Sequence, residues 1–210
     1  MKQVLILSVL FVFFLFGCGK KEVETKKAEE PPEQVTEAPK TQEKTEPVSQ
    51  EPLVREKNPV VVMETSLGTI ELELYWKETP KTAENLLRLV NSKFYDGLTF
   101  HRIVPNFVIQ GGDPLGDGTG GPGYMIPFEQ ATTKHLRGSL GMARSQDPNS
   151  AGSQFYICLK DIPHLDGNYV VFGKVIKGMD VVDKIAQVPT LPGDKPKEKV
   201  LMTKVYEKTQ

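Results

Sequence analysis

The chain has 210 residues and carries 26 Lys and Arg against 27 Asp and Glu, for a formal net charge of −1. This balance gives no support for nucleic-acid binding, which needs a basic excess or a basic stripe. Cys18 and Cys158 are the two cysteines, which excludes a framework of several disulfides.

The amino terminus has the pattern of a secretory signal: Lys2, an apolar run over 4–16, and a small residue before Cys18. The run is shorter than the ~20 apolar residues of a membrane-spanning helix. Gly17 and Cys18 resemble the lipobox of bacterial lipoproteins, in which the cysteine carries the lipid. We therefore predict a lipoprotein signal peptide over 1–17 and lipidation of Cys18. An ordinary signal peptide near an unrelated cysteine is the alternative.

Residues 18–58 are rich in Glu, Lys, Pro, Thr and Gln and have few large apolar side chains. Such a segment buries too little surface to offset its chain entropy, so we predict a disordered tether spanning roughly 35 Å. The remainder, 59–210, has the length of one domain with a sizeable core. We expect this domain to be held in the bacterial cell envelope. Gly19, in place of Asp, favours the outer membrane facing the periplasm.

The first part of the predicted domain reads as a hairpin followed by a helix. Ile70, Leu72 and Leu74 alternate with Glu71 and Glu73, the period of a half-buried strand, so 60–63 and 69–75 are predicted strands. After them, Thr79 and Pro80 are typical of a helix start, with Thr as the N-cap. One apolar face follows at helical spacing.

Further along the chain, short apolar segments separated by turn signals predict more strands and one more helix. The helix is expected over 179–186, and the strands over 99–104, 108–110, 139–143, 155–159, 170–175 and 200–206. Many short strands with few helices favour a closed antiparallel barrel or a sandwich. The glycine-rich stretch 113–123 is predicted to be a surface loop, because Pro122 and Pro127 exclude the helix that a phosphate-binding loop requires.

The segment 100–113, Phe-His-Arg-Ile-Val-Pro-Asn-Phe-Val-Ile-Gln-Gly-Gly-Asp, places Arg102 and Gln110 among apolar residues with no nucleophile beside them. That combination suits a reaction without bond cleavage. Two other segments, 152–157 (Gly-Ser-Gln-Phe-Tyr-Ile) and 165–175 (Leu-Asp-Gly-Asn-Tyr-Val-Val-Phe-Gly-Lys-Val), accompany it. Together the three segments resemble the cyclophilin family of peptidyl-prolyl isomerases.

This resemblance implies a mainly β fold, a closed eight-stranded antiparallel barrel capped by two α-helices. It implies isomerase activity on Pro-containing unfolded or partly folded proteins, without a cofactor or metal, in a chain we expect to be monomeric. Arg102 matches the catalytic donor and Gln110 a polar group that orients it. The matching substrate-binding positions are Phe107, Val108, Ala143, Arg144, Gln154, Tyr156, His164, Leu165 and Tyr169.

Several of these positions depart from the commoner family residues. Tyr156 replaces Phe, Val108 replaces Met, and Arg144 replaces Asn. His164 stands where a Trp is often present, which predicts weak sensitivity to cyclosporin, and Tyr169 stands in place of a His. None of these changes removes the donor.

The residues give little support to other functions. The histidines lack metal-ligand spacing, and Ser139 and Ser153 lack a nucleophile-elbow motif, so metal catalysis and hydrolysis are disfavoured. The main alternative is a membrane-tethered module that binds Pro-containing segments and whose turnover is incidental.

Overall fold

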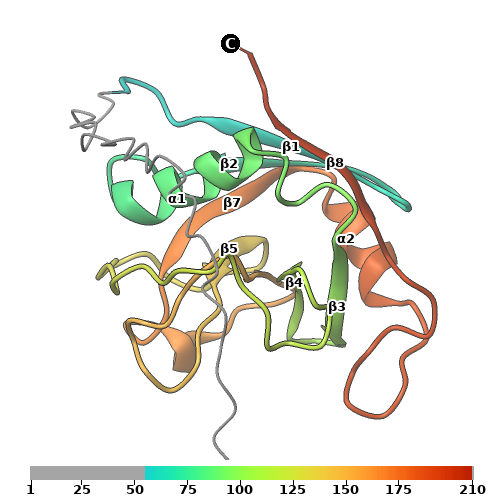
Figure 1. Ribbon diagram of the computed structural model, residues 1–210. Helices are drawn as coiled ribbons and strands as arrows, with labels where there is room; N and C mark the ends of the chain where they lie inside the picture. The colour runs from blue at the N-terminus through green and yellow to red at the C-terminus, as the bar shows by residue number, and fades with distance from the viewer. Residues whose placement is uncertain (1–54, 210) are drawn as a thin grey trace, which may run out of the picture. The chain divides into compact units, whose positions relative to one another are not determined.

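The computed structural model describes residues 55–209, which lie within one compact unit, Gln50–Gln210. The predicted signal peptide, Cys18 and most of the predicted tether lie outside the described residues. The fold is mainly β with two α-helices (Figure 1). The strands are β1 Val60–Thr65, β2 Gly68–Leu74, β3 Thr99–Val104, β4 Val108–Asp113, β5 Ser139–Met142, β6 Phe155–Cys158, β7 Val171–Lys177 and β8 Met202–Glu207.

The eight strands form one antiparallel sheet in the order β3-β4-β6-β5-β7-β2-β1-β8. The two edge strands meet at a seam, where an isolated bridge joins Thr99 to Leu201. Beside it, the Phe100 N–H donates to the Val200 carbonyl at 3.0 Å. The sheet is therefore a nearly closed barrel, and the predicted eight-stranded fold class is confirmed.

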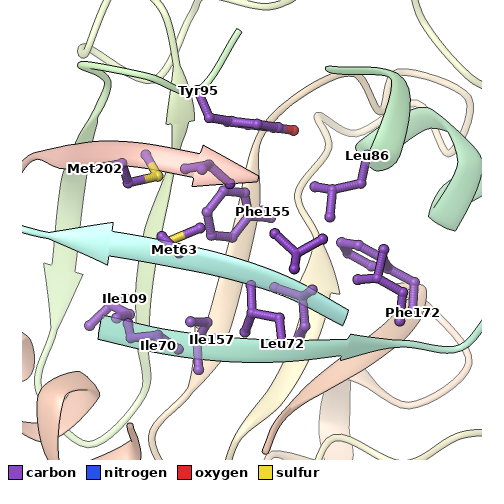
Figure 2. Close-up of a cluster of buried hydrophobic side chains, with 14 of the residues drawn as sticks. Met63, Ile70, Leu72, Leu86, Tyr95, Ile109, Phe155, Ile157, Phe172 and Met202 are labelled. Atoms are coloured by element: carbon purple, nitrogen blue, oxygen red, sulfur yellow. The ribbon is translucent and has the colours of Figure 1, made fainter. Parts of the chain in front are cut away.

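The barrel interior is filled by side chains that alternate along each strand. Ile103 pairs with Ile109, Ile109 with Ile157, and Ile157 with Leu140, and all four side chains are fully buried. Figure 2 shows Ile109 and Ile157 within this core, which also contains Met63, Ile70, Leu72, Phe155, Phe172 and Met202. Because side chains alternate between faces, the residues between these pairs point to the outside of the barrel.

The helices α1 Pro80–Asn91 and α2 Met179–Ala186 cover different parts of the barrel (Figure 1). The first contacts β7 and β8, and the second contacts β2, β3 and β4. Within the described residues, neither helix is long and apolar enough to cross a membrane.

The cap of α1 differs from the prediction. Thr79 precedes the helix, but its hydroxyl donates to the Tyr75 carbonyl instead of accepting from the first turn. The carboxylate of Glu129 accepts the N–H groups of Lys81 and Thr82 at 3.1 and 2.9 Å. A distant acidic side chain thus satisfies the free donors of the first turn, where negative charge is favourable.

The element bounds lie close to those predicted from periodicity. Strand β4 extends to Asp113, three residues beyond the predicted end, because Gly111 continues the pairing with Phe155. A short 3₁₀ helix, η1 Pro163–Leu165, was not predicted.

Residues 55–58, which precede the predicted domain start, contact the barrel. Arg55 forms an ion pair with Glu207, and its guanidinium lies 5.2 Å from the centre of the Trp76 ring. The Trp76 N–H donates to Asn58 Oδ1 at 3.2 Å.

Candidate active site

One row of residues crosses the outer face of the barrel. Arg102 on β3 pairs with Gln110 on β4, Gln110 with Tyr156 on β6, and Tyr156 with Gly141 on β5. Adjacent strands lie about 4.8 Å apart, so these four residues from four strands become neighbours. This row is the centre of the candidate site.

A β-bulge in β3 at His101 aims the arginine outward. The pairing of β3 with β4 passes from Phe100 directly to Arg102. Phe100 and Ile103 are both buried in the core, which leaves His101 and Arg102 between two inward-facing residues. Bulges commonly re-aim side chains beside active sites.

A chain of side-chain amides holds Arg102. Its Nη1 donates to Gln110 Oε1 at 3.3 Å, and Gln110 Nε2 donates to Gln154 Oε1 at 3.0 Å. Gln154 Nε2 in turn donates to the carbonyls of Gly118 and Gly120 at 3.0 and 2.8 Å. The glycine-rich loop therefore holds Gln154, the last side chain of this hydrogen-bonded series. As predicted, no helix begins directly after the loop.

The loop is itself organised by a buried carboxylate. Asp113, 1% exposed, accepts the N–H groups of Leu115, Asp117 and Gly118. A side chain at Gly120 would collide with it, because a Cβ there would lie 2.1 Å from Asp113 Oδ1. A surface hollow of about 530 Å³ lies between this loop and the segments 143–145 and 150–154, lined in part by Gln110, Gly120 and Arg144.

An apolar cluster separate from the barrel core lies on the same outer face. Its buried members are Val108, Tyr156, Cys158 and Ile162, and its half-buried members are Phe107, Ala143, Leu165 and Tyr169. Burial raises the pKa of the Cys158 thiol to about 12, so this cysteine is a neutral, unreactive part of the cluster.

The ring of Tyr156 lies across Gly141. A Cβ at Gly141 would be 2.2 Å from Tyr156 Cζ, so glycine is required for the ring to adopt this position. The Tyr156 hydroxyl lies 2.9 Å from His135 Nε2, and the two rings stack with an interplanar angle of 14°.

His135 connects Tyr156 to the η1 segment. Its Nδ1 lies 2.9 Å from Asp166 Oδ1, its backbone N–H donates to the same oxygen, and its carbonyl accepts the N–H of Ile162. The hydrogen bonds from His135, from its backbone first, lower the pKa of Asp166 to about 2. An ionised carboxylate only accepts, which assigns the His135 proton to Nδ1, and the Tyr156 hydroxyl must then donate to Nε2.

Burial lowers the pKa of His135 and raises that of Tyr156. Both groups are therefore neutral near pH 7, as this hydrogen-bond assignment requires.

The rim of the cluster is aromatic and cationic. His164 is exposed and stacks on Phe107 at 6.1 Å between ring centres, with an interplanar angle of 8°. The guanidinium of Arg144 lies 4.5 Å from the centre of the Tyr169 ring. Arg144 also donates to the carbonyls of Ser145, Gln146 and Asn168. Because backbone carbonyls occupy its donors, Arg144 braces the two loops at this edge of the cluster.

The structure brings the predicted site residues from 102 to 169 together along one outer face of the barrel, beside the hollow described above; this strip is called the groove below. Arg102, Gln110 and Gln154 form its polar side, while Phe107, Val108, Tyr156 and Leu165 form its apolar side. Ala143, Arg144, His164 and Tyr169 lie at its edge. Their individual roles stay predictions, and Cys18 lies outside the described residues.

Three contributors were missed by the sequence reasoning: His135, Gly141 and Asp194. Asp194 Oδ2 lies 3.7 Å from Arg102 Nε. Pro192-Gly193 before Asp194 is a turn signal in the sequence, but no sequence pattern indicates which strand the turn contacts. In residues 55–209, no group of three or more His, Cys, Asp or Glu side chains is arranged to hold a metal ion.

Comparison with known proteins agrees with this geometry. Residues 60–207 match the family described as cyclophilin type peptidyl-prolyl cis-trans isomerase/CLD. A peptidyl-prolyl cis-trans isomerase of Helicobacter pylori is 47% identical over 129 residues, which cover 60% of this chain and 78% of the relative. Another, from Arabidopsis thaliana, is 43% identical over 156 residues, covering 71% of this chain and 94% of the relative.

Solved structures agree with the sequence matches. A crystal structure of a cyclophilin type peptidyl-prolyl cis-trans isomerase from Cryptosporidium parvum superposes with a TM-score of 0.70 at 33% identity, and covers 73% of this chain and 99% of that chain. A second structure of the same protein was determined in the presence of the dipeptide Ala-Pro, and superposes with a TM-score of 0.69 at 34% identity.

Proposed function

The chain belongs to the cyclophilin-type peptidyl-prolyl cis-trans isomerase family, and from that premise we propose that the groove around Arg102 and Tyr156 is its active site. The single observation that carries the proposal is that the guanidinium of Arg102, held by a hydrogen bond to Gln110, lies on the same outer face of the barrel as the apolar cluster. The Ala-Pro dipeptide used with the related structure supports a proline-sized ligand for this groove.

The reaction requires the peptide bond before proline to rotate through a twisted state. The barrier is about 18 to 20 kcal/mol, and the uncatalysed process takes about 10 to 100 s. In the twisted state the prolyl nitrogen regains a lone pair that can accept a hydrogen bond, and the carbonyl loses charge separation. A hydrogen-bond donor near the nitrogen and apolar surroundings both favour that state over the planar one.

Arg102 supplies the donor. A guanidinium is permanently charged and presents its N–H groups in a rigid fork. Gln110 accepts from one nitrogen of that fork and so limits its rotation. The Arg102 side chain is 40% exposed, which leaves other N–H groups accessible to a bound peptide.

The donor alone does not account for the rate. A turnover of about 10³ s⁻¹ is a ~10⁵-fold acceleration, or about 7 kcal/mol. One preorganised donor contributes about 3 to 4 kcal/mol. The apolar cluster of Val108, Tyr156, Leu165 and Phe107 supplies the remainder by binding the proline ring and removing water from the peptide.

Exchange spectroscopy by NMR on a Pro-containing peptide tests this assignment. We expect Arg102→Ala to lower kcat/KM by about 10²- to 10³-fold and Arg102→Lys to be intermediate. Arg137→Ala is the matched control, because Arg137 forms a similarly exposed ion pair with Asp183; its kcat/KM should remain at the wild-type value. Arg102→Ala with full activity would refute the role of the arginine.

We further propose that the enzyme acts in the bacterial cell envelope, anchored through a lipid on Cys18, on Pro-containing secreted or envelope proteins. The signal-like amino terminus and the polar segment after Cys18 support this proposal. Metabolic labelling with a radioactive fatty acid should label the chain and not Cys18→Ser, and membrane fractionation should place it with the outer membrane. Labelling of Cys18→Ser to the same extent would contradict it.

The alternative is a tethered binding module with incidental turnover. The aromatic rim formed by half-buried Phe107 and exposed His164 suits peptide binding as such. Arg102→Ala expressed in cells separates the two functions. Loss of the cellular role together with isomerisation supports the enzyme, and a cellular role that survives in the inactive variant supports the binding module.

A further inference from the structure

At the barrel seam, the acidic side chain of Asp194 lies beside Arg102, the candidate catalytic residue. Pro192 and Gly193 occupy the centre of a turn in which the Asp194 N–H donates to the Leu191 carbonyl at 3.1 Å. Pro followed by Gly is the signature of a type II turn, and Gly193 has the positive φ, 86°, that this turn requires. Asp194 itself has φ 65°, a left-handed conformation that Asp tolerates.

This turn is fixed to β3 immediately beside Arg102. The Asp194 carbonyl accepts the N–H of Ile103 at 2.8 Å. Six residues later, Val200 accepts the N–H of Phe100, so the segment spans the His101 bulge from one side to the other. The backbone of Asp194 is therefore held in register with the bulge that turns Arg102 outward.

The carboxylate of Asp194 lies near a different nitrogen of the guanidinium from the one that Gln110 contacts. Asp194 Oδ2 lies 3.7 Å from Arg102 Nε, and Gln110 Oε1 lies 3.3 Å from Nη1. Within residues 55–209, no hydrogen bond from Arg102 Nη2 to another residue is formed. Gln110 thus accepts a hydrogen bond from one nitrogen of the fork, the Asp194 carboxylate lies at ion-pair distance from a second, and the third nitrogen is left for a ligand.

We propose that Asp194 is a positioning residue for isomerisation: it holds the Arg102 fork in the orientation that presents Nη2 to the prolyl nitrogen. The inference rests on the proposed role of Arg102. Both side chains are about 40% exposed, so solvent screens the pair and its contribution is modest. We expect a two- to five-fold effect on kcat, about 0.4 to 1 kcal/mol, which lies within the range of an exposed ion pair.

The test uses two substitutions that keep the turn, measured in the full-length protein. Asp194→Gly removes the side chain at a position where glycine is unstrained, and Asp194→Asn removes the charge while tolerating positive φ. We expect Asp194→Gly to lower kcat two- to five-fold with KM unchanged, because the contact with nitrogen forms in the twisted state. Asp194→Asn should fall between this variant and the wild type.

Asp183→Asn is the matched control, because Asp183 pairs with Arg137 at nearly the same exposure and lies outside the groove. Its kcat should equal the wild-type value. A double-mutant cycle with Arg102→Lys measures whether Asp194 affects kcat through Arg102 or only through the stability of the turn. Lysine has no Nε–H for Asp194 to orient, so Asp194→Gly should cause no further loss in the Arg102→Lys background.

Equal losses in both backgrounds, or an unchanged kcat in Asp194→Gly, would overturn the inference. Either outcome leaves the proposed function intact if Arg102→Ala is inactive. Full activity of Arg102→Ala overturns the proposed function itself.

Discussion

The hydroxyl of Tyr156 offers a sharp test of the site, because it separates stability from catalysis. Tyr156 is 5% exposed, and its hydroxyl donates to His135 Nε2 at 2.9 Å. The His135 side chain is fully buried, with Nδ1 bound to Asp166. Tyr156→Phe would therefore leave one buried acceptor without a partner.

The magnitude follows from that geometry. An unsatisfied buried polar group costs about 1 to 3 kcal/mol. For a domain of this size, each 1 kcal/mol shifts Tm by about 2 to 4 °C, so Tyr156→Phe should lower Tm by about 2 to 12 °C. The apolar ring that faces the groove is retained, so kcat/KM should stay within about two-fold of the wild type.

Thermal unfolding followed by circular dichroism, with the peptide exchange assay in parallel, measures both quantities. Tyr206→Phe is the control, because Tyr206 is 36% exposed and its hydroxyl can bind water in either state. An unchanged Tm for Tyr156→Phe would mean that His135 Nε2 does not depend on the hydroxyl, which would refute the tautomer assignment. A large loss of kcat/KM at normal Tm would show that the hydroxyl contacts the substrate.

Three further predictions concern other parts of the domain. Gly141→Ala should cost about 1 to 3 kcal/mol of unfolding free energy and lower kcat/KM, since its Cβ would overlap Tyr156; Gly121→Ala, with open space around it, should keep wild-type stability. Iodoacetamide at pH 8 should leave Cys158 unlabelled until the protein is denatured, because burial raises its pKa to about 12; rapid native labelling, detected by mass spectrometry, would contradict this. Burial lowers the pKa of His101, so the unfolded state takes up the proton first as pH falls and stability declines below about pH 6.5. His101→Leu should reduce that decline between pH 7 and 5 in urea titrations, and an unchanged slope would refute it. Neither ring nitrogen of His101 has a partner within residues 55–209, so this variant should be no less stable at pH 7.

The strands and helices were predictable because their signal is local. Ile70, Leu72 and Leu74 alternate with acidic residues, and only one register buries all three; β2 has that pattern. The sequence placed Thr79 as the N-cap residue of α1, but the acceptor for the first-turn N–H groups could not be predicted, because Glu129 is 47 residues from Thr82 in sequence and reaches it only after the chain has folded.

By itself the sequence determined the strand periodicity, the apolar setting of Arg102 and the resemblance that joined three distant segments into one site. The tertiary structure decided what holds those groups in place. The bulge at His101, the ring of Tyr156 lying over Gly141, and Asp194 beside Arg102 all depend on which strands are neighbours. Periodicity specifies which side of a strand is buried, whereas contacts across strands arise only when the barrel closes.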